Sequence, residues 1–498
     1  MKKVLTIILD GFGMKEDVYG NPVKNAGMTN FINIWNNYPH ALLKCSEESL
    51  GFSKGEKCNS EIGHKIIGSG RKVKNKNKIM SESINKNILV NSPKYQKMIR
   101  YLKEKDSSIH LVFLLSEDSL LSNIEDLKYI TQNLKTNHIK NIYLHIITDG
   151  EDSSKFFSLE FFKQHSDALN DYKIASICGK YYALDEIGDY TKTEVYYDLL
   201  INSKGVNTPS IERIIKLCYD KKITDAYLPP IKTKDFVPLD DGDVLLFLNY
   251  SKSNQYQIID SLTSKEFEQF EREKVDVKVF SLFEVDKKLN YEHILLEKEE
   301  TNTLCEYIGK LGLTQARITE EIKEDSITYY LDGARDIKID NLENFILTSN
   351  KVEFIEKKPE MKALNIAKVI VKCMENDYDM IYANFPNPDT IGHTGNFQAT
   401  INALQAIDVC LGKIMEVAEE NFYKIIILGS HANCDTIIDR DNNIITGNTD
   451  SPVPFIILDK SIKLKNGTLD QVAPTILNYL DIAIPKEMKN TESLIEES

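Results

Sequence analysis

Six short, largely apolar runs, each followed within two residues by a polar residue or a glycine, constrain the fold of this 498-residue chain most strongly. They are rich in Ile, Val and Leu and span residues 4–9, 142–148, 174–178, 244–248, 380–385 and 425–428. Such runs are typical of strands buried on both faces of a parallel sheet. Helical periodicity lies between them, for example over 361–373 and 401–418. This alternation predicts an α/β protein.

Composition and charge exclude several classes of protein. With 42% hydrophobic and 27% charged residues, the chain is typical of folded globular proteins, and its length suggests about three domains of roughly 150 residues. A net charge of −14 disfavours nucleic acid and anionic membranes as partners. The N-terminal apolar run is too short for a secretory signal, and no stretch approaches the ~20 apolar residues of a membrane span. The eight scattered cysteines are expected to be reduced thiols in a cytoplasmic protein.

Polar clusters that follow the predicted strands are candidates for chemistry, because ligands of open α/β sheets gather at the carboxyl ends of the strands. The clusters are Asp10, residues 58–64, residues 387–395 and residues 430–433. Asp389 and His393 are four residues apart and would share one face of a helix. Carboxylate and imidazole ligands suit Zn²⁺ or Mn²⁺, and two such ions would clamp a phosphoryl group during transfer. A hydroxyl such as that of Ser60 would be activated as a nucleophile by one of them.

Each cluster taken alone also has a structural interpretation. Asp10 is typical of a helix cap, and Ser60 resembles a helix N-cap with an acidic residue nearby. Cys58 and Cys434 lie near these motifs and would be softer metal ligands, although a buried structural role is more frequent for cysteine.

The order of the motifs adds information that no single motif carries. The chain contains, in this order, Asp10-Gly-Phe-Gly, Asn59-Ser60-Glu-Ile-Gly-His64, Gly68-Ser-Gly70-Arg71, Asp149-Gly-Glu-Asp152, Gln315-Ala-Arg-Ile318, Asn387-Pro-Asp-Thr-Ile-Gly-His393-Thr-Gly and Ser451-Pro-Val-Pro-Phe455. This series resembles the cofactor-independent (2,3-bisphosphoglycerate-independent) phosphoglycerate mutase family of the alkaline phosphatase superfamily. The resemblance extends over essentially the whole chain.

The resemblance implies a fold and a reaction. A discontinuous, alkaline-phosphatase-like domain of residues 1–74 and 300–498 would bind metal, and an inserted α/β transferase-like domain of residues 75–299 would bind substrate. The family interconverts 3-phosphoglycerate and 2-phosphoglycerate through a phosphoserine. The chain would therefore be a monomer acting on a small phosphorylated metabolite.

The resemblance also implies roles for individual residues. Ser60 would be the catalytic nucleophile. Of two divalent ions, Mn²⁺ or else Mg²⁺ or Zn²⁺, one would be held by Asp389, His393 and a third ligand. The other would be held by Asp10, Ser60, His431 and a fourth ligand. The expected substrate-binding residues are Asp152, Lys180 and Lys323, and Arg317 is also retained.

Several positions depart from the family pattern. Ser430 and Asn448 replace an aspartate and a histidine that bind metal, which should weaken binding by at least about 10–100-fold. Substrate-binding arginines are replaced at Glu151, Glu186, Ser251 and Asn254, Lys180 replaces a fifth, and Leu121 replaces a histidine. Four lost contacts to an anion amount to about 6 kcal/mol, or roughly four decades of affinity.

Three functions are therefore consistent with the sequence. The first is phosphoglycerate mutase-type phosphoryl transfer, which family resemblance favours. The second is a metal-dependent phosphatase or phosphotransferase acting on another phosphorylated substrate. The third is a non-catalytic relative that binds a ligand or a partner.

Overall fold

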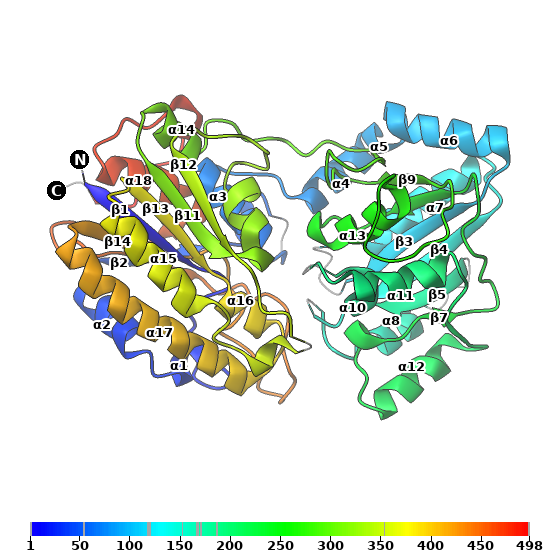
Figure 1. Cartoon of the computed structure of the whole chain (residues 1–498), viewed down its shortest axis with the longest axis horizontal. Coiled ribbons are helices and arrows are strands. Elements are labelled where there is room, and N and C mark those ends of the chain that lie inside the picture. Colours follow the sequence, from blue (N-terminus) through cyan, green and yellow to red (C-terminus); the bar gives the residue numbers. More distant parts are fainter. Residues whose placement is uncertain are drawn as a thin grey trace. The chain divides into compact units, whose positions relative to one another are not determined.

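The computed structural model describes residues 2–52, 55–116, 121–151, 153–165, 169, 172–185, 188–352 and 354–496, with the backbone alone at 253 and 254. The chain divides into two compact units (Figure 1). Unit 1 comprises Met1–Asn75 and Lys298–Ser498, and unit 2 comprises Lys76–Glu297. The chain therefore passes from unit 1 to unit 2 between Asn75 and Lys76 and returns between Glu297 and Lys298.

Unit 1 contains a sheet whose described strands run in the order β12-β11-β13-β1-β14-β15-β2-β16. The strands are β1 (Lys3–Leu9), β2 (His40–Lys44), β11 (Gln315–Glu320), β12 (Leu342–Leu347), β13 (Met380–Phe385), β14 (Tyr423–Gly429), β15 (Val453–Ile457) and β16 (Gly467–Thr468). β1 pairs in parallel with β13 on one side and with β14 on the other. β15 is antiparallel to both of its neighbours.

Both faces of this sheet are covered by helices. These are α1 (Pro22–Asn25), α2 (Thr29–Asn37), α3 (Ser60–Ser69), α14 (Leu304–Lys310), α15 (Ala363–Glu375), α16 (Asn387–Gly392), α17 (Phe397–Glu420) and α18 (Val472–Tyr479). Val4 and Ile8 of β1 belong to the core that α3 and α18 cover. Leu5 and Ile7 point to the opposite core, beneath α15 and α17. The alternation of a strand thus explains why every residue of the first apolar run is buried.

Unit 2 contains a second sheet, with strand order β10-β9-β8-β3-β4-β5-β7-β6. The strands are β3 (Ile109–Leu115), β4 (Ile142–Thr148), β5 (Lys173–Gly179), β6 (Val206–Asn207), β7 (Ile231–Lys232), β8 (Val244–Phe247), β9 (Lys278–Ser281) and β10 (Glu292–His293). The helices are α4 (Lys76–Asn85), α5 (Ile88–Asn91), α6 (Pro93–Lys105), α7 (Ile124–Thr136), α8 (Ser158–Gln164), α10 (Lys180–Ala183), α11 (Tyr190–Leu200), α12 (Ile211–Asp220) and α13 (Ser253–Thr263). Separate cores lie on the two faces of the sheet.

These two sheets confirm the α/β prediction. Each of the six apolar runs forms a strand, and the helical patterns at 361–373 and 401–418 fall on α15 and α17. All eight cysteines are buried and unpaired with one another in disulfides, as expected for reduced thiols. Among the described residues, no helix combines the length and the apolar character needed to cross a membrane.

Asp126 of unit 2 gives a pH-dependent prediction. Burial raises its pKa to about 6, although the Tyr250 hydroxyl donates a hydrogen bond to it. In the unfolded chain an aspartate titrates near 3.9. Between these values the folded protein holds a proton that the unfolded chain has released, so its free energy of unfolding falls as pH rises, by up to about 3 kcal/mol.

Asp126→Asn removes this titration. We therefore expect the free energy of unfolding of the variant, minus that of the wild type, to increase as the pH rises from 4.5 to 7.5. Urea unfolding of both proteins, followed by a probe in unit 2, measures the difference. A difference that does not change with pH contradicts the prediction.

Candidate active site

Asp10 lies at the centre of the candidate site because β1 ends there between two parallel neighbours. Its backbone N–H donates to the carbonyl of Phe385, the last residue of β13, at 3.1 Å. The next residue, Gly11, has a φ of +73°, and a Cβ built on it would lie 2.7 Å from the Cα of Asp389. A glycine is required at this position, because only the missing side chain lets α16 approach the end of β1 so closely.

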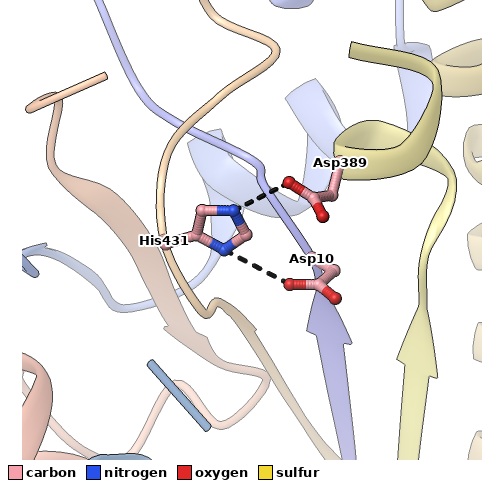
Figure 2. Close-up of side chains that lie close together, drawn as sticks. All are labelled: Asp10, Asp389 and His431. Carbon is pink, nitrogen blue, oxygen red and sulfur yellow. Dashed lines mark hydrogen bonds and ion pairs between the residues drawn. The ribbon is translucent and has the colours of Figure 1, made fainter. Parts of the chain in front are cut away.

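Three residues that follow β1, β13 and β14 form a compact ligand cluster (Figure 2). Asp10, Asp389 and His431 are buried, and each offers one ligand atom within 4.8 Å of the other two. His431 lies between the carboxylates, with Nε2 2.8 Å from Asp389 Oδ1 and Nδ1 3.3 Å from Asp10 Oδ1. Two carboxylate oxygens and an imidazole nitrogen suit a divalent ion such as Mn²⁺ or Zn²⁺. The donor set therefore fits the metal that the sequence predicts.

Asp389 and His393 meet as their spacing predicts. Asp389 is in α16 and His393 caps its C-terminus, so that His393 Nε2 lies 3.1 Å from Asp389 Oδ1. The other carboxylate oxygen of Asp389 accepts a hydrogen bond from Lys323 Nζ at 2.6 Å, and the same ammonium lies 3.8 Å from Asp10. Lys323, which the sequence places among the substrate-binding residues, is thus located at the two carboxylates of the candidate metal site.

The electrostatics of this cluster favour charged side chains despite their burial. Burial alone raises the pKa of Asp10 and Asp389. Attraction to Lys323 and to the neighbouring histidines, taken together, outweighs burial and holds both pKa values below the usual range. For His431, burial lowers the pKa, but Asp389 and Asp10 raise it to about 10. Metal binding to His431 would therefore have to displace a proton from the ring.

Ser60 is the first residue of α3 and is not the cap of that helix. The cap is Asn59, whose side chain accepts the N–H of Ile62 at 3.0 Å, so the structural interpretation of Ser60 as an N-cap is wrong. The Ser60 hydroxyl instead lies 2.8 Å and 3.1 Å from the two carboxylate oxygens of Asp10. Gly63 allows this position, since a Cβ there would lie 2.3 Å from the carbonyl oxygen of Ser430.

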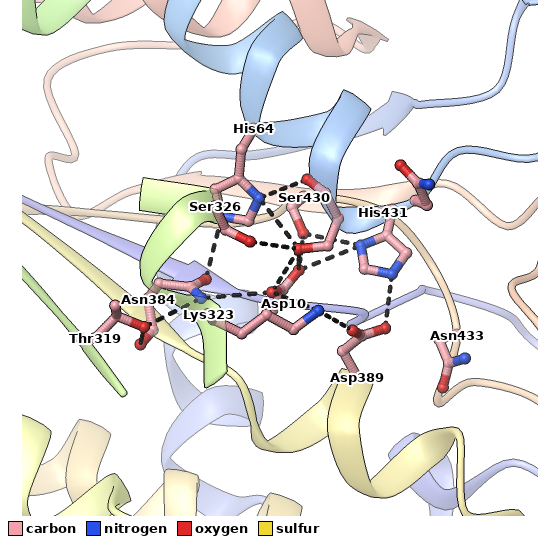
Figure 3. Close-up of polar contacts among 12 residues, drawn as sticks. Asp10, His64, Thr319, Lys323, Ser326, Asn384, Asp389, Ser430, His431 and Asn433 are labelled. Carbon is pink, nitrogen blue, oxygen red and sulfur yellow. Dashed lines mark hydrogen bonds and ion pairs between the residues drawn. The ribbon is translucent and has the colours of Figure 1, made fainter. Parts of the chain in front are cut away.

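Figure 3 shows further polar residues around Asp10 that the sequence analysis did not assign a role. His64 Nδ1 lies 2.8 Å from the backbone carbonyl of Ser60, and its Nε2 lies 3.3 Å from Asn384 Oδ1. Asn384 Nδ2 donates to Asp10 at 3.4 Å. The sequence signal for Asn384 is its polarity within the apolar run 380–385.

Ser326 was also missed, and no sequence signal marks it. It follows β11 and the short 3-10 helix η3 (Glu321–Lys323), and it begins a π-helical turn, η4 (Ser326–Tyr330). Its hydroxyl lies 3.1 Å from that of Ser60. Only the fold brings these two serines together.

The two substituted metal positions have different surroundings. Ser430 Oγ donates a hydrogen bond to Asp10 at 2.5 Å and lies 3.0 Å from His431 Nδ1, so it contacts two residues of the cluster. Asn448 is 4% exposed, and in the part of the chain that the structure describes its Oδ1 has no hydrogen-bond partner.

Cys58 and Cys434 lie outside the three-ligand cluster. Burial raises the pKa of both thiols, which disfavours the thiolate form that binds metal.

In unit 2, Lys180 is buried and paired with acidic groups. Its Nζ lies 3.1 Å from Glu151 and 3.8 Å from Asp149, whose carboxylate also accepts the Ser153 hydroxyl at 2.7 Å. The substrate-binding prediction for Asp152 falls outside the described residues, as does Glu186.

Arg317 is in unit 1, on β11. It is only 2% exposed, and its guanidinium pairs with Asp332. This retained arginine therefore has a buried structural partner.

Comparison with known proteins places this chain in a family. The model of the metalloenzyme superfamily matches residues 2–484. The 2,3-bisphosphoglycerate-independent phosphoglycerate mutase of Clostridium perfringens (strain SM101) is 32% identical over 504 residues, covering 98% of both chains. That of Clostridium acetobutylicum is 32% identical over 508 residues, covering 99% of both. The chain belongs to this mutase family.

The fold agrees with this assignment. A crystal structure of phosphoglycerate mutase from Leishmania mexicana, obtained at low cobalt concentration, matches with a TM-score of 0.93 and 23% identity. The match covers 100% of this chain and 98% of that one. Membership in the metalloenzyme superfamily implies dependence on a divalent metal ion, for which the Asp10–Asp389–His431 cluster supplies suitable ligands.

Removal of one carboxylate should weaken metal binding. We expect Asp389→Asn to lower the affinity for Mn²⁺ at least about 10-fold, because the loss of even an outer partner has that effect. Calorimetric titration of the metal-free protein measures it. The matched control is Asp435→Asn, a buried aspartate outside the cluster that accepts the hydroxyls of Thr449 and Ser451. Equal affinities of the two variants contradict the assignment.

Proposed function

We propose that the protein catalyses phosphoglycerate mutase-type phosphoryl transfer, with Ser60 as the phosphoryl acceptor. The observation that carries this proposal is the hydroxyl of Ser60, hydrogen-bonded to Asp10 beside the three-ligand cluster. Family membership supports it independently, since the two relatives named above are phosphoglycerate mutases. The expected overall reaction converts 3-phosphoglycerate into 2-phosphoglycerate.

The chemistry requires a deprotonated Ser60. In the first step Ser60 Oγ forms a bond to phosphorus, the bond from phosphorus to the substrate oxygen breaks, and that oxygen receives the proton that Ser60 loses. The second step reverses this exchange at the other hydroxyl of the glycerate. Asp10 accepts the Ser60 hydrogen bond and orients the hydroxyl, and the Lys323 ammonium supplies positive charge beside the site. A bound divalent ion lowers the pKa of a coordinated hydroxyl and offsets negative charge on the phosphoryl group.

The finer features of the proposal follow the family. Two divalent ions, with Mn²⁺ as the first choice, would use Asp389 and His393 for one site and Asp10, Ser60 and His431 for the other. The substrate is a small phosphorylated metabolite, and the protein works as a cytoplasmic monomer. Lys180 and Asp152 are the proposed substrate contacts in unit 2.

Ser60→Ala tests the proposal. An enolase-coupled assay with 3-phosphoglycerate and excess Mn²⁺ should give saturable turnover for the wild type. We expect the variant to lose at least about 10³-fold, since removal of a covalent nucleophile leaves only residual catalysis. Mass spectrometry should find phosphate on Ser60 in the wild type.

The control is Ser69→Ala, a buried serine of the same helix whose hydroxyl donates to a backbone carbonyl. It should retain wild-type turnover. Wild-type activity no higher than that of Ser60→Ala overturns the mutase proposal.

One observation favours a second candidate function, a phosphatase or phosphotransferase that acts on a less anionic substrate. Lys180, the proposed anion contact, is paired with Glu151 at 3.1 Å. A carboxylate at this position repels a phosphate or carboxylate group and offsets the attraction of the lysine.

Glu151→Gln separates the two candidates. If Lys180 binds an anionic substrate, loss of the competing carboxylate should lower KM for 3-phosphoglycerate about 2- to 5-fold, as expected for a partly exposed ion pair. Steady-state kinetics measure this change. The matched control is Glu125→Gln, which breaks an exposed pair with Lys128 elsewhere in unit 2 and should leave KM unchanged. An unchanged KM in Glu151→Gln favours the second candidate.

A further inference from the structure

The hydroxyl of Ser326 has an unusual position for a residue that no motif marks. Ser326 is 5% exposed and begins the π-helical turn that follows β11. In the part of the chain that the structure describes, its hydroxyl has one hydrogen-bond partner, Ser60 Oγ at 3.1 Å. π-Helical turns are rare and frequently occur at functional sites.

The direction of this hydrogen bond follows from the other contacts of Ser60. The ionised carboxylate of Asp10 can only accept, so the single proton of the Ser60 hydroxyl is donated to Asp10. Ser60 Oγ is therefore the acceptor in its contact with Ser326, and the Ser326 hydroxyl is the donor. Once its proton has left, Ser60 Oγ has three lone pairs: one accepts this hydrogen bond, one would bind a metal ion, and one attacks phosphorus.

The backbone holds the two serines at this separation. α3 begins at Ser60 and passes so close to the end of the π-helical turn that a Cβ on Gly68 would lie 1.9 Å from the carbonyl oxygen of Leu331. Lys323, three residues before Ser326, is anchored to Asp389. The segment between residues 323 and 331 is thus held at one end by the hydrogen bond to Asp389 and packs at the other end against α3.

We infer that Ser326 is a positioning residue for the nucleophile. By donating to Ser60 Oγ, it fixes the direction of the attacking lone pair and stabilises negative charge on that oxygen as the proton leaves. The inference rests on the proposed function, in which Ser60 forms the bond to phosphorus. A hydrogen bond of this kind acts on the chemical step and not on substrate binding, because it does not contact the substrate.

The test compares three variants in the Mn²⁺-loaded, full-length protein with 3-phosphoglycerate. Ser326→Ala removes the donor, and we expect kcat to fall about 10- to 100-fold with KM within about twofold of the wild type. Ser326→Thr keeps a hydroxyl and should recover kcat to within about threefold. Thr328→Val is the matched control, because Thr328 lies in the same turn but donates to the carbonyl of Glu324. It should behave as the wild type.

Single-turnover formation of phospho-Ser60 and thermal unfolding complete the test. The phosphorylation rate should fall in parallel with kcat in Ser326→Ala, while its melting temperature stays close to that of Thr328→Val. An active wild type with equally active Ser326→Ala overturns the inference and leaves the proposed function standing. The inference is also overturned if Ser326→Ala loses kcat and Ser326→Thr, although folded, does not recover it. A wild type that never phosphorylates Ser60 overturns the proposed function and the inference with it.

Discussion

The parallel pairing of β1 with β13 and β14 is the interaction on which the candidate site depends. In register, Leu9 at the end of β1 lies beside Phe385 of β13 and Gly429 of β14. The residues that follow these three strands therefore emerge together at one edge of the sheet. Asp10, Asp389 and His431 come from positions far apart in the sequence, and no local interaction would bring them into contact.

Two glycines then determine how closely helices α16 and α3 approach the ends of these strands. Gly11 lets α16 approach the end of β1, and Gly63 lets α3 rest against the backbone after β14. The first of these contacts determines the position of Asp389, and the second that of Ser60. Close packing of backbones, and not side-chain contact alone, thus fixes the distances between Ser60 and the Asp10–Asp389–His431 cluster.

Burial of so many ionisable groups has a large desolvation penalty that must be offset by neighbouring charges. The negative charges of Asp10 and Asp389 are offset by the positive charges of Lys323 and His431. This explains why the pKa values of the two carboxyls stay low in a buried site. A chain that needed only stability would be served as well by apolar side chains here. A cluster of this composition is better explained by metal binding and catalysis, in agreement with the family to which the chain belongs.

Much of the fold and part of the candidate site could be predicted from the sequence, because apolar runs with polar residues at their ends indicate local structure. The strands, the helix that joins Asp389 to His393 and the family are examples. The motif around Ser60 was also recognised, but the alternative role of Ser60 as a helix cap was wrong, since Asn59 caps the helix instead. Ser326 and Asn384 were missed because their contacts with the site are with residues far away in the sequence.

The location of Lys323 was missed for the same reason. Its resemblance to a family position gave it a role in substrate binding, yet its contacts with Asp389 and Asp10 appear only when β11 lies beside β13. Sequence patterns therefore predict which strand ends carry polar residues. Local patterns alone do not predict which residues from different strand ends are in contact.

In the proposed site, the ends of β1, β13 and β14 form a metal centre beside Ser60. Anomalous diffraction from crystals of the protein grown with Mn²⁺ tests this most directly. We expect an anomalous peak within coordination distance, about 2.0–2.3 Å, of Asp10, Asp389 or His431. Crystals with saturating Mn²⁺ and no anomalous peak at these residues would contradict it.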